Sequence, residues 1–207
     1  MGKKGKPPKA LNKKELVVDA GRKLFLREGF GATSMDAVAL EAGVSKATVY
    51  SYFTSKEAFF AEIMEGMCRE LGGNSLDGAS RDSPAAFLKD VGLFGVRRLL
   101  QTLDLAILRR VVAESQQFPA LGETFWTTGP RNIKEFVADY LREQHRRGTL
   151  YVPDADKSAM LFLGLTMGIY LLPLLLGIRK PPEEKEIHRD LEQVISGFLT
   201  TLAPRNK

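Results

Sequence analysis

The sequence has little of what several classes of protein require. Its 207 residues contain one cysteine, Cys68, and two histidines. A single cysteine cannot form a disulfide within the chain, so we expect a protein of the reducing cytoplasm. The N-terminal stretch "MGKKGKPPKALNKK" lacks the apolar core of a secretory signal, and we expect it to be disordered.

Residue patterns typical of enzyme sites are also missing. The sequence shows no glycine-rich phosphate loop, no His and Cys spacing of a metal site, and no nucleophile beside a base. Asp154 and Asp156 are interpreted as the cap of the helix that follows them, not as a catalytic pair. His145 is expected at an exposed helix end and His188 on an outer helix face. We therefore predict no enzymatic activity, no cofactor and no metal.

Alternating Val, Ile and Thr residues, which would indicate β-strands, are absent too, and helical periodicity runs through most of the chain. We predict an all-α fold with a three-helix N-terminal head and a larger C-terminal helical body. About nine helices are expected. They are a helix over 13–28, one that Thr33 opens and that ends near Gly43, one that begins at Ser45, one that Thr54 opens and that runs through Met67, and helices at about 84–101, 104–116, 129–148, 154–176 and 184–203.

Positive charge is concentrated near the N-terminus. Residues 1–56 contain 11 Lys and Arg against 5 Asp and Glu, a net charge of +6, whereas the other 19 and 20 give −1. This asymmetry is expected if the first quarter of the chain binds a polyanion and the rest does not. A solvated lysine tail that binds nothing would give the same counts, so charge alone leaves both interpretations open.

The stretch "GVSKATVYSYFTSKEAFF", residues 43–60, indicates a helix-turn-helix. Gly43 can form the tight turn between its two helices, and small residues precede it where the helices would cross. Val49 and Phe53, four residues apart, would face the interior. The opposite side of the second helix would then face the major groove of DNA. The residues expected there are Ser45, Lys46, Ala47, Thr48 and Tyr50.

These side chains suit contact with DNA. Lys46 can reach a phosphate or a guanine edge, and Thr48 can bond a base or a phosphate. Ala47 lets the helix approach and could touch a thymine methyl group. Tyr52 and Lys56 would bind the DNA backbone, Lys56 at a helix N-terminus that itself favours an anion. A head of this kind that binds protein is the alternative, and its association would be insensitive to salt.

Three motifs follow one another in this region: "F-x-x-x-G-F-x-x-T-S", "A-G-V-S-K-A-T-V-Y" and "Y-F-x-S-K-E". With them, residues 13–63 resemble the DNA-binding region of the TetR/AcrR family of bacterial transcriptional regulators. The resemblance implies phosphate contacts by Thr33 and Ser34, in addition to the residues named above. Ala47 stands where glycine is frequent in the family and Tyr52 where histidine is frequent, which leaves the operator sequence open.

The same resemblance implies three parts of the chain: a basic arm over 1–12, a DNA-binding domain over 13–58, and a ligand-binding and dimerisation domain over 59–207. The protein would be a homodimer that represses transcription from a palindromic double-stranded DNA operator. A small hydrophobic effector would release it. The segment "RRVVAESQQFPALGETFWTTGP" is similar to the efflux-repressor branch of the family, so efflux or detoxification genes are the expected targets.

Candidate effector-binding residues in the body are mostly aromatic. Aromatic residues at helical spacing are more often plain core, so both interpretations stay open. The charged candidates could hold a polar group of the effector or be solvated. The candidates are Phe94, Arg98, Glu114, Phe118, Trp126, Tyr140, Phe162, Met167 and Tyr170.

Residues 158–178 form an uncharged run of 21 residues, which is long enough to span a membrane. The interpretation we favour is a helix buried between an effector cavity, the last helix and a partner subunit, because the apolar stripe of 187–202 also needs an apolar partner. By the family resemblance, the dimer would form through the helices at about 154–176 and 184–203, with no membrane contact. A membrane-anchored or protein-binding helical module that uses 158–178 is the alternative.

Overall fold

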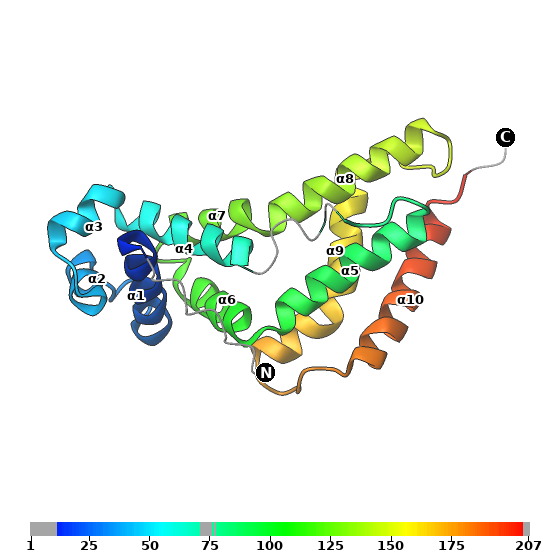
Figure 1. Ribbon diagram of the computed structural model, residues 1–207. Coiled ribbons are helices and arrows are strands. Elements are labelled where there is room, and N and C mark those ends of the chain that lie inside the picture. Colours follow the sequence, from blue (N-terminus) through cyan, green and yellow to red (C-terminus); the bar gives the residue numbers. More distant parts are fainter. Residues whose placement is uncertain (1–11, 71–75, 77, 205–207) are drawn as a thin grey trace, which may run out of the picture.

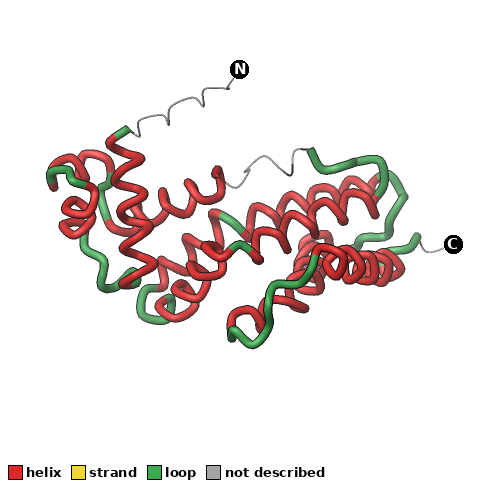
Figure 2. The backbone as a smooth tube through the Cα atoms, turned by 60° about the horizontal axis from the view of Figure 1, so that its bottom comes forward, coloured by secondary structure: helices red, strands yellow, loops and turns green. Residues whose placement is uncertain are grey.

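The computed structural model describes residues 12–70, 76 and 78–204, and these residues form ten α-helices and no strand (Figures 1 and 2). The helices are α1 (Lys13–Glu28), α2 (Met35–Ala42), α3 (Lys46–Tyr52), α4 (Lys56–Glu70), α5 (Pro84–Leu100), α6 (Thr102–Glu114), α7 (Pro119–Thr128), α8 (Pro130–Arg146), α9 (Ala155–Leu175) and α10 (Glu184–Thr201). The molecule is elongated. Figure 1 shows α1, α2 and α3 at one end, α4, α6 and α7 in the middle, and α5, α8, α9 and α10 at the other end.

The predicted all-α fold is confirmed, and the helix that the sequence did not indicate is α7. It fills the gap between the helices expected at about 104–116 and 129–148, and it begins within the sequence "FPALGE". Pro119 stands in its first turn, where a missing N–H is not needed and the fixed backbone angle suits a helix. The same proline therefore begins a helix instead of separating two.

Two helices begin one residue later than their sequences indicate. The hydroxyl oxygen of Ser34, not that of Thr33, accepts the N–H three residues further on. Ser55 has this role at the start of α4, in place of Thr54. Thr33 cannot cap because its side chain is buried in the head. The cap predicted at Ser45 is confirmed.

Buried side chains form two hydrophobic clusters. One belongs to the body and joins α5, α8, α9 and α10. The other fills the head but continues into the middle of the molecule, with Phe59 and Ile63 of α4, Ile107 of α6 and Leu121 of α7. The head is therefore packed against the middle helices. The division of the chain at residue 58 stays a prediction, and the basic arm lies, apart from Asn12, outside the described residues.

The long apolar segment forms α9, which is the one helix in the described residues with the length and composition of a membrane span. Such a single helix does not indicate a membrane protein. In this single chain α9 is buried on one face and not all round, because large apolar side chains on the other face are open to solvent. These exposed residues are Met160, Leu161, Leu165, Ile169 and Leu172.

Candidate nucleic-acid interface

A tight turn sets the angle between α2 and α3. Gly43 ends α2 in the left-handed conformation, with φ 66° and ψ 33°, which glycine adopts at little cost. The N–H of Val44 donates a hydrogen bond to the carbonyl of Ala39 at 3.0 Å. The hydroxyl of Ser45 then accepts the N–H of Thr48 at 3.2 Å and starts α3. The local conformation of Gly43 and the cap at Ser45 thus form the helix-turn-helix.

One side of α3 is anchored in the head. Val49 is fully buried and Phe53 is 4% exposed, as predicted. The ring of Phe53 lies 4.8 Å from that of Phe59, and Val38 and Ala39 of α2 belong to the same cluster. Burying these apolar side chains fixes the rotation of α3 about its axis, so its other side must face outward.

The outward side carries most of the residues predicted to bind DNA. Thr48 is half-buried, and its hydroxyl lies 2.9 Å from that of Ser45. Ser51 also lies on this surface and was not predicted, although position 51 follows 47 by one helical turn. The predicted residues exposed on or beside α3 are Ser45, Lys46, Ala47, Tyr50 and Tyr52, and Ser34 is exposed at the start of α2.

Two predicted DNA contacts lie elsewhere. The hydroxyl of Thr33 points inward and donates to the carbonyl of Gly29 at 2.7 Å. The ammonium group of Lys56 donates to the carbonyls of Phe30, Gly31 and Thr33 at 2.7, 3.2 and 3.1 Å and lies 4.4 Å from the centre of the Phe30 ring. Both side chains therefore hold the turn between α1 and α2 in this structure.

The start of α4, where a DNA phosphate was expected, holds a carboxylate of the chain itself. The N–H of Glu57 and the hydroxyl of Ser55 stabilise the charged form of the Glu57 carboxylate and lower its pKa. An approaching phosphate would have to replace this carboxylate. The anion site at this helix end stays a prediction.

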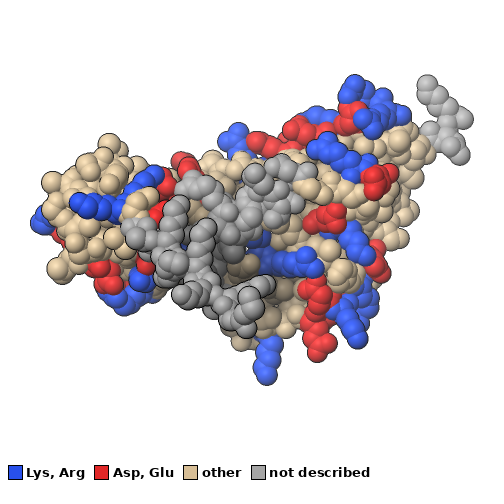
Figure 3. Space-filling model, in the orientation of Figure 1, with Lys and Arg blue, Asp and Glu red and all other residues tan. Residues whose placement is uncertain are grey.

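The positive charge of the N-terminal quarter lies only partly in the described head. Residues 12–56 contain 7 Lys and Arg against 5 Asp and Glu, and the other four lysines precede residue 12. Figure 3 shows Lys and Arg intermixed with Asp and Glu over the body, so the face in view has no large patch of positive charge there. In the described residues, the surface predicted to bind DNA is thus distinguished by its side chains more than by its net charge.

The predicted effector-binding residues fall into separate places. Glu114 and Phe118 contact the head: the Glu114 carboxylate accepts two N–H groups of the turn between α1 and α2, and the ring of Phe118 lies 5.3 Å from that of Phe30. Trp126 on α7 is 41% exposed. The structure does not bring these three residues together with the candidates in the body.

The remaining candidates lie on α5, α8 and α9. Phe162 is fully buried, Met167 packs against Gly95, and Phe94 and Arg98 are half-buried on α5. Phe162 and Met167 belong to the hydrophobic cluster of the body, as expected for plain core residues, whereas Phe94 and Arg98 are not part of it.

Tyr170 and Tyr140 are buried phenols with different surroundings. Burial, together with the hydrogen bond to Asp190 at 2.7 Å, raises the pKa of Tyr170. The ring of Tyr140 stacks on that of Phe87 with centres 3.7 Å apart, and burial raises its pKa too. Within the described residues, the Tyr140 hydroxyl has no hydrogen-bond partner although it is buried. A buried unpaired hydroxyl is costly and therefore calls for a partner.

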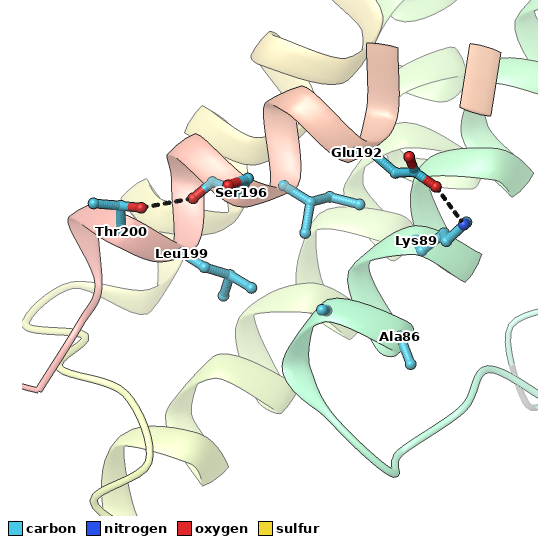
Figure 4. Close-up of a pocket in the computed structure, with 8 residues that line it drawn as sticks. Ala86, Lys89, Glu192, Ser196, Leu199 and Thr200 are labelled. Carbon is cyan, nitrogen blue, oxygen red and sulfur yellow. Dashed lines mark hydrogen bonds and ion pairs between the residues drawn. The ribbon is translucent and has the colours of Figure 1, made fainter. Parts of the chain in front are cut away.

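A groove of about 640 Å³ runs between α5 and α10 (Figure 4). An ion pair of 3.0 Å between Lys89 and Glu192 crosses it near one end, and Ser196 and Thr200 lie near the other. None of the nine predicted effector residues lines it. The groove is open to solvent, unlike the enclosed sites that usually hold small ligands.

Comparison with known proteins agrees with this geometry. A family profile described as "Bacterial regulatory proteins, tetR family" matches residues 17–63, and one described as "AefR-like transcriptional repressor, C-terminal domain" matches residues 86–203. The solved structure of the "Flavonoid-responsive Regulator FrrA" is 35% identical, with a TM-score of 0.82, and the match covers 94% of this chain and 98% of that one.

Two curated proteins show more distant similarity along most of the chain. The "Uncharacterized HTH-type transcriptional regulator YhgD" of Bacillus subtilis is 24% identical over 77% of this chain and 83% of its own. The "HTH-type transcriptional regulator UidR" of Escherichia coli is 25% identical over 74% and 77%. The helix-turn-helix, the helical body and both profile matches lead to one conclusion: the chain belongs to the TetR family of bacterial transcriptional regulators.

Proposed function

We propose that this regulator is a homodimeric repressor that binds a palindromic operator through α3 and leaves it when a small hydrophobic molecule binds the body. TetR regulators bind operator DNA and typically dimerise and bind effectors. The observation that carries the DNA-binding half is the outward side of α3, where Lys46, Ala47 and Tyr50 are exposed while Val49 anchors the helix. Exposed donors on an anchored helix suit the major groove.

The effector half of the proposal is supported by the stack around Tyr140. The ring of Phe87 lies 3.7 Å from that of Tyr140 and 5.4 Å from that of Phe136, and a planar aromatic molecule that displaced one of these rings could stack on the others. The unpaired Tyr140 hydroxyl would then gain a hydrogen-bond partner. A relative with 35% identity is named as flavonoid-responsive. We therefore propose a flavonoid-like, polycyclic aromatic effector; efflux or detoxification genes as targets stay a prediction.

The dimer would use the open face of α9 together with α10. Leu165 and Leu172 are 41% and 62% exposed, and burying them against a second copy would be favourable. Gly164 and Gly168 on α9 and Gly197 on α10 are exposed with no atom near the position of a Cβ, so a partner helix could approach closely there. This arrangement supports an interface in which the same surface of each subunit faces its copy.

Fluorescence anisotropy with DNA from the regions beside the gene tests the proposal. We expect tight binding at low salt. The logarithm of the binding constant should fall linearly with the logarithm of the salt concentration, with a slope of about −0.9 for each phosphate contact. The flavonoid quercetin should weaken binding and raise the melting temperature of the DNA-free protein, because a ligand stabilises the state that it binds. Binding insensitive to salt would favour the protein-binding module, and operator binding unaffected by quercetin would contradict a flavonoid-like effector.

A further inference from the structure

The turn between α1 and α2 is held by charged groups on both sides of its backbone. Glu114, the last residue of α6, accepts the N–H of Phe30 at 3.1 Å with one carboxylate oxygen and the N–H of Gly31 at 2.8 Å with the other. Lys56 of α4 binds the carbonyls of the same two residues. The peptide groups of this turn are thus paired with a carboxylate and an ammonium group, and charge-assisted hydrogen bonds are the stronger kind.

One helical turn before Glu114, a second side chain of α6 binds the head. The guanidinium of Arg110 donates to the carbonyl of Leu26 at 3.0 and 3.2 Å and to that of Arg27 at 2.9 Å. These carbonyls lie in the last turn of α1, where the helix leaves its oxygens without internal partners and favours a cation. We call Arg110 and Glu114 the α6 latch.

The head accommodates the latch with glycines. Gly29 has a φ of +91°, and a Cβ there would lie 2.3 Å from an oxygen of Glu114. A Cβ on Gly31 would lie 3.0 Å from the ring of Phe118, which follows α6. Any larger residue at position 29 would push the carboxylate out of reach of the N–H groups. The close approach of α6 is therefore built into both partners.

The same helix also holds the body. Arg109, next to Arg110 in the chain, donates to the carbonyls of Leu174 and Leu175 at 2.6 and 3.0 Å, at the end of α9. Neighbouring residues of α6 thus bind the ends of α1 in the head and of α9 in the body. A shift of α9 relative to the rest of the body would move α6, and the latch would turn the head with it.

We propose that the α6 latch sets the orientation of the head and that Glu114 is the positioning residue through which the body regulates DNA binding. The regulatory part rests on the proposed function, whereas the orientation is a property of the protein alone. Glu114→Gln keeps the shape of the side chain but presents an amide N–H₂ to one of the two N–H donors. Glu123→Gln, on the exposed side of α7, is the matched control.

Distances measured by electron spin resonance test the orientation. Spin labels at Leu40→Cys in the head and Lys185→Cys in the body, in a Cys68→Ser background diluted with unlabelled protein, report one distance within a chain. We expect a narrow distribution for the parent and for Glu123→Gln, and a broader or shifted one for Glu114→Gln. A distribution for Glu114→Gln equal to that of the parent overturns the proposal. If Glu114→Gln loses its helical circular dichroism, Arg110→Met is measured in its place and judged by the same criterion.

Operator titrations with and without quercetin test the regulatory part. The factor by which quercetin weakens operator binding, expected between about 5 and 150 in the parent, should fall toward 1 in Glu114→Gln. The affinity of the DNA-free variant for quercetin should stay that of the parent, which a general loss of structure would not allow. A parental factor in the variant overturns the regulatory part. If the parent itself binds no operator or ignores quercetin, the proposed function fails, and the distances still decide the role of the latch.

Discussion

On α3 the ammonium group of Lys46 lies 2.5 Å from the carboxylate of Asp36, and both side chains are more than half exposed. Exposed ion pairs of this kind add little to stability because water screens them. Lys46 can therefore leave Asp36 for a phosphate or a guanine at small cost. If α3 binds DNA as proposed, Lys46 and the exposed Tyr50 contribute more to that binding than to folding.

Replacing Lys46 or Tyr50 by alanine should weaken operator binding by about 1–3 kcal/mol in each case, because a contact to DNA is lost. The melting temperature should change little, since both side chains are exposed. Lys180→Ala, which removes an exposed charge at the far end of the chain, is the control. Anisotropy titrations at fixed salt measure the effect. Parental affinity in both variants would show that α3 does not bind the operator through this side.

Phe53 has the opposite role. Phe53→Ala should lower the free energy of unfolding by about 3–5 kcal/mol, because the ring is buried against Phe59 and its removal leaves a cavity. Tyr52→Ala, a neighbouring exposed ring, should change stability by only about 0.5 kcal/mol. Urea unfolding followed by circular dichroism measures both. A loss for Phe53→Ala as small as that for Tyr52→Ala would contradict its anchoring role.

At the scale of elements, short helices in the head depend on the residues between them. α2 and α3 have eight and seven residues, too few to be stable alone, so the turn and the packing must hold them. Gly43 is the critical turn residue, because its left-handed conformation strains other residues.

Gly43→Ala should therefore destabilise the protein by about 1–2 kcal/mol through backbone strain alone, since a Cβ there meets no atom within 4 Å. Gly43→Asn should cost less, because asparagine visits this conformation more readily. Thermal unfolding of the three proteins gives the order glycine, asparagine, alanine. Equal melting temperatures for all three would mean that the turn tolerates another backbone conformation.

At the scale of the whole molecule, the proposed dimer connects the role of the open face of α9 with that of the exposed side of α3. In the proposed dimer, each copy of α3 would bind one half-site of a palindromic operator, which requires the two copies to lie about 34 Å apart. The contact between subunits would then set this spacing. Dimerisation through α9 and DNA binding through α3 should be lost together.

Leu172→Arg should convert the dimer to a monomer, because it places a charge in the apolar face that the second copy would cover. Operator affinity should fall with it, since a monomer binds only one half-site. Leu40→Arg, at an exposed leucine of the head, should leave the molecular mass unchanged. Light scattering after size-exclusion chromatography measures the mass. A dimer in Leu172→Arg would place the interface elsewhere.

The sequence by itself determined the all-α class, most helices and which side of α3 faces outward. Capping residues, glycine at a helix end and helical periodicity act over a few residues, so their effects can be predicted from the local sequence. Val49 and Phe53 are buried for this reason, and the residues between them face outward. Where two local signals conflict, as for Pro119 at the start of α7, the prediction from the sequence was wrong and missed the helix.

Only the tertiary structure decided which distant groups meet. Glu114 is a candidate effector-binding residue by sequence, yet its carboxylate accepts hydrogen bonds from N–H groups 83 and 84 positions away in the head. Lys56 is expected to bind a DNA phosphate, yet in this structure its ammonium group donates to three backbone carbonyls. Periodicity shows which side of a helix is apolar or charged but not what lies opposite, because packing of remote segments fixes that. α9 is the clearest case: its sequence is apolar all round, and the fold alone leaves one face open.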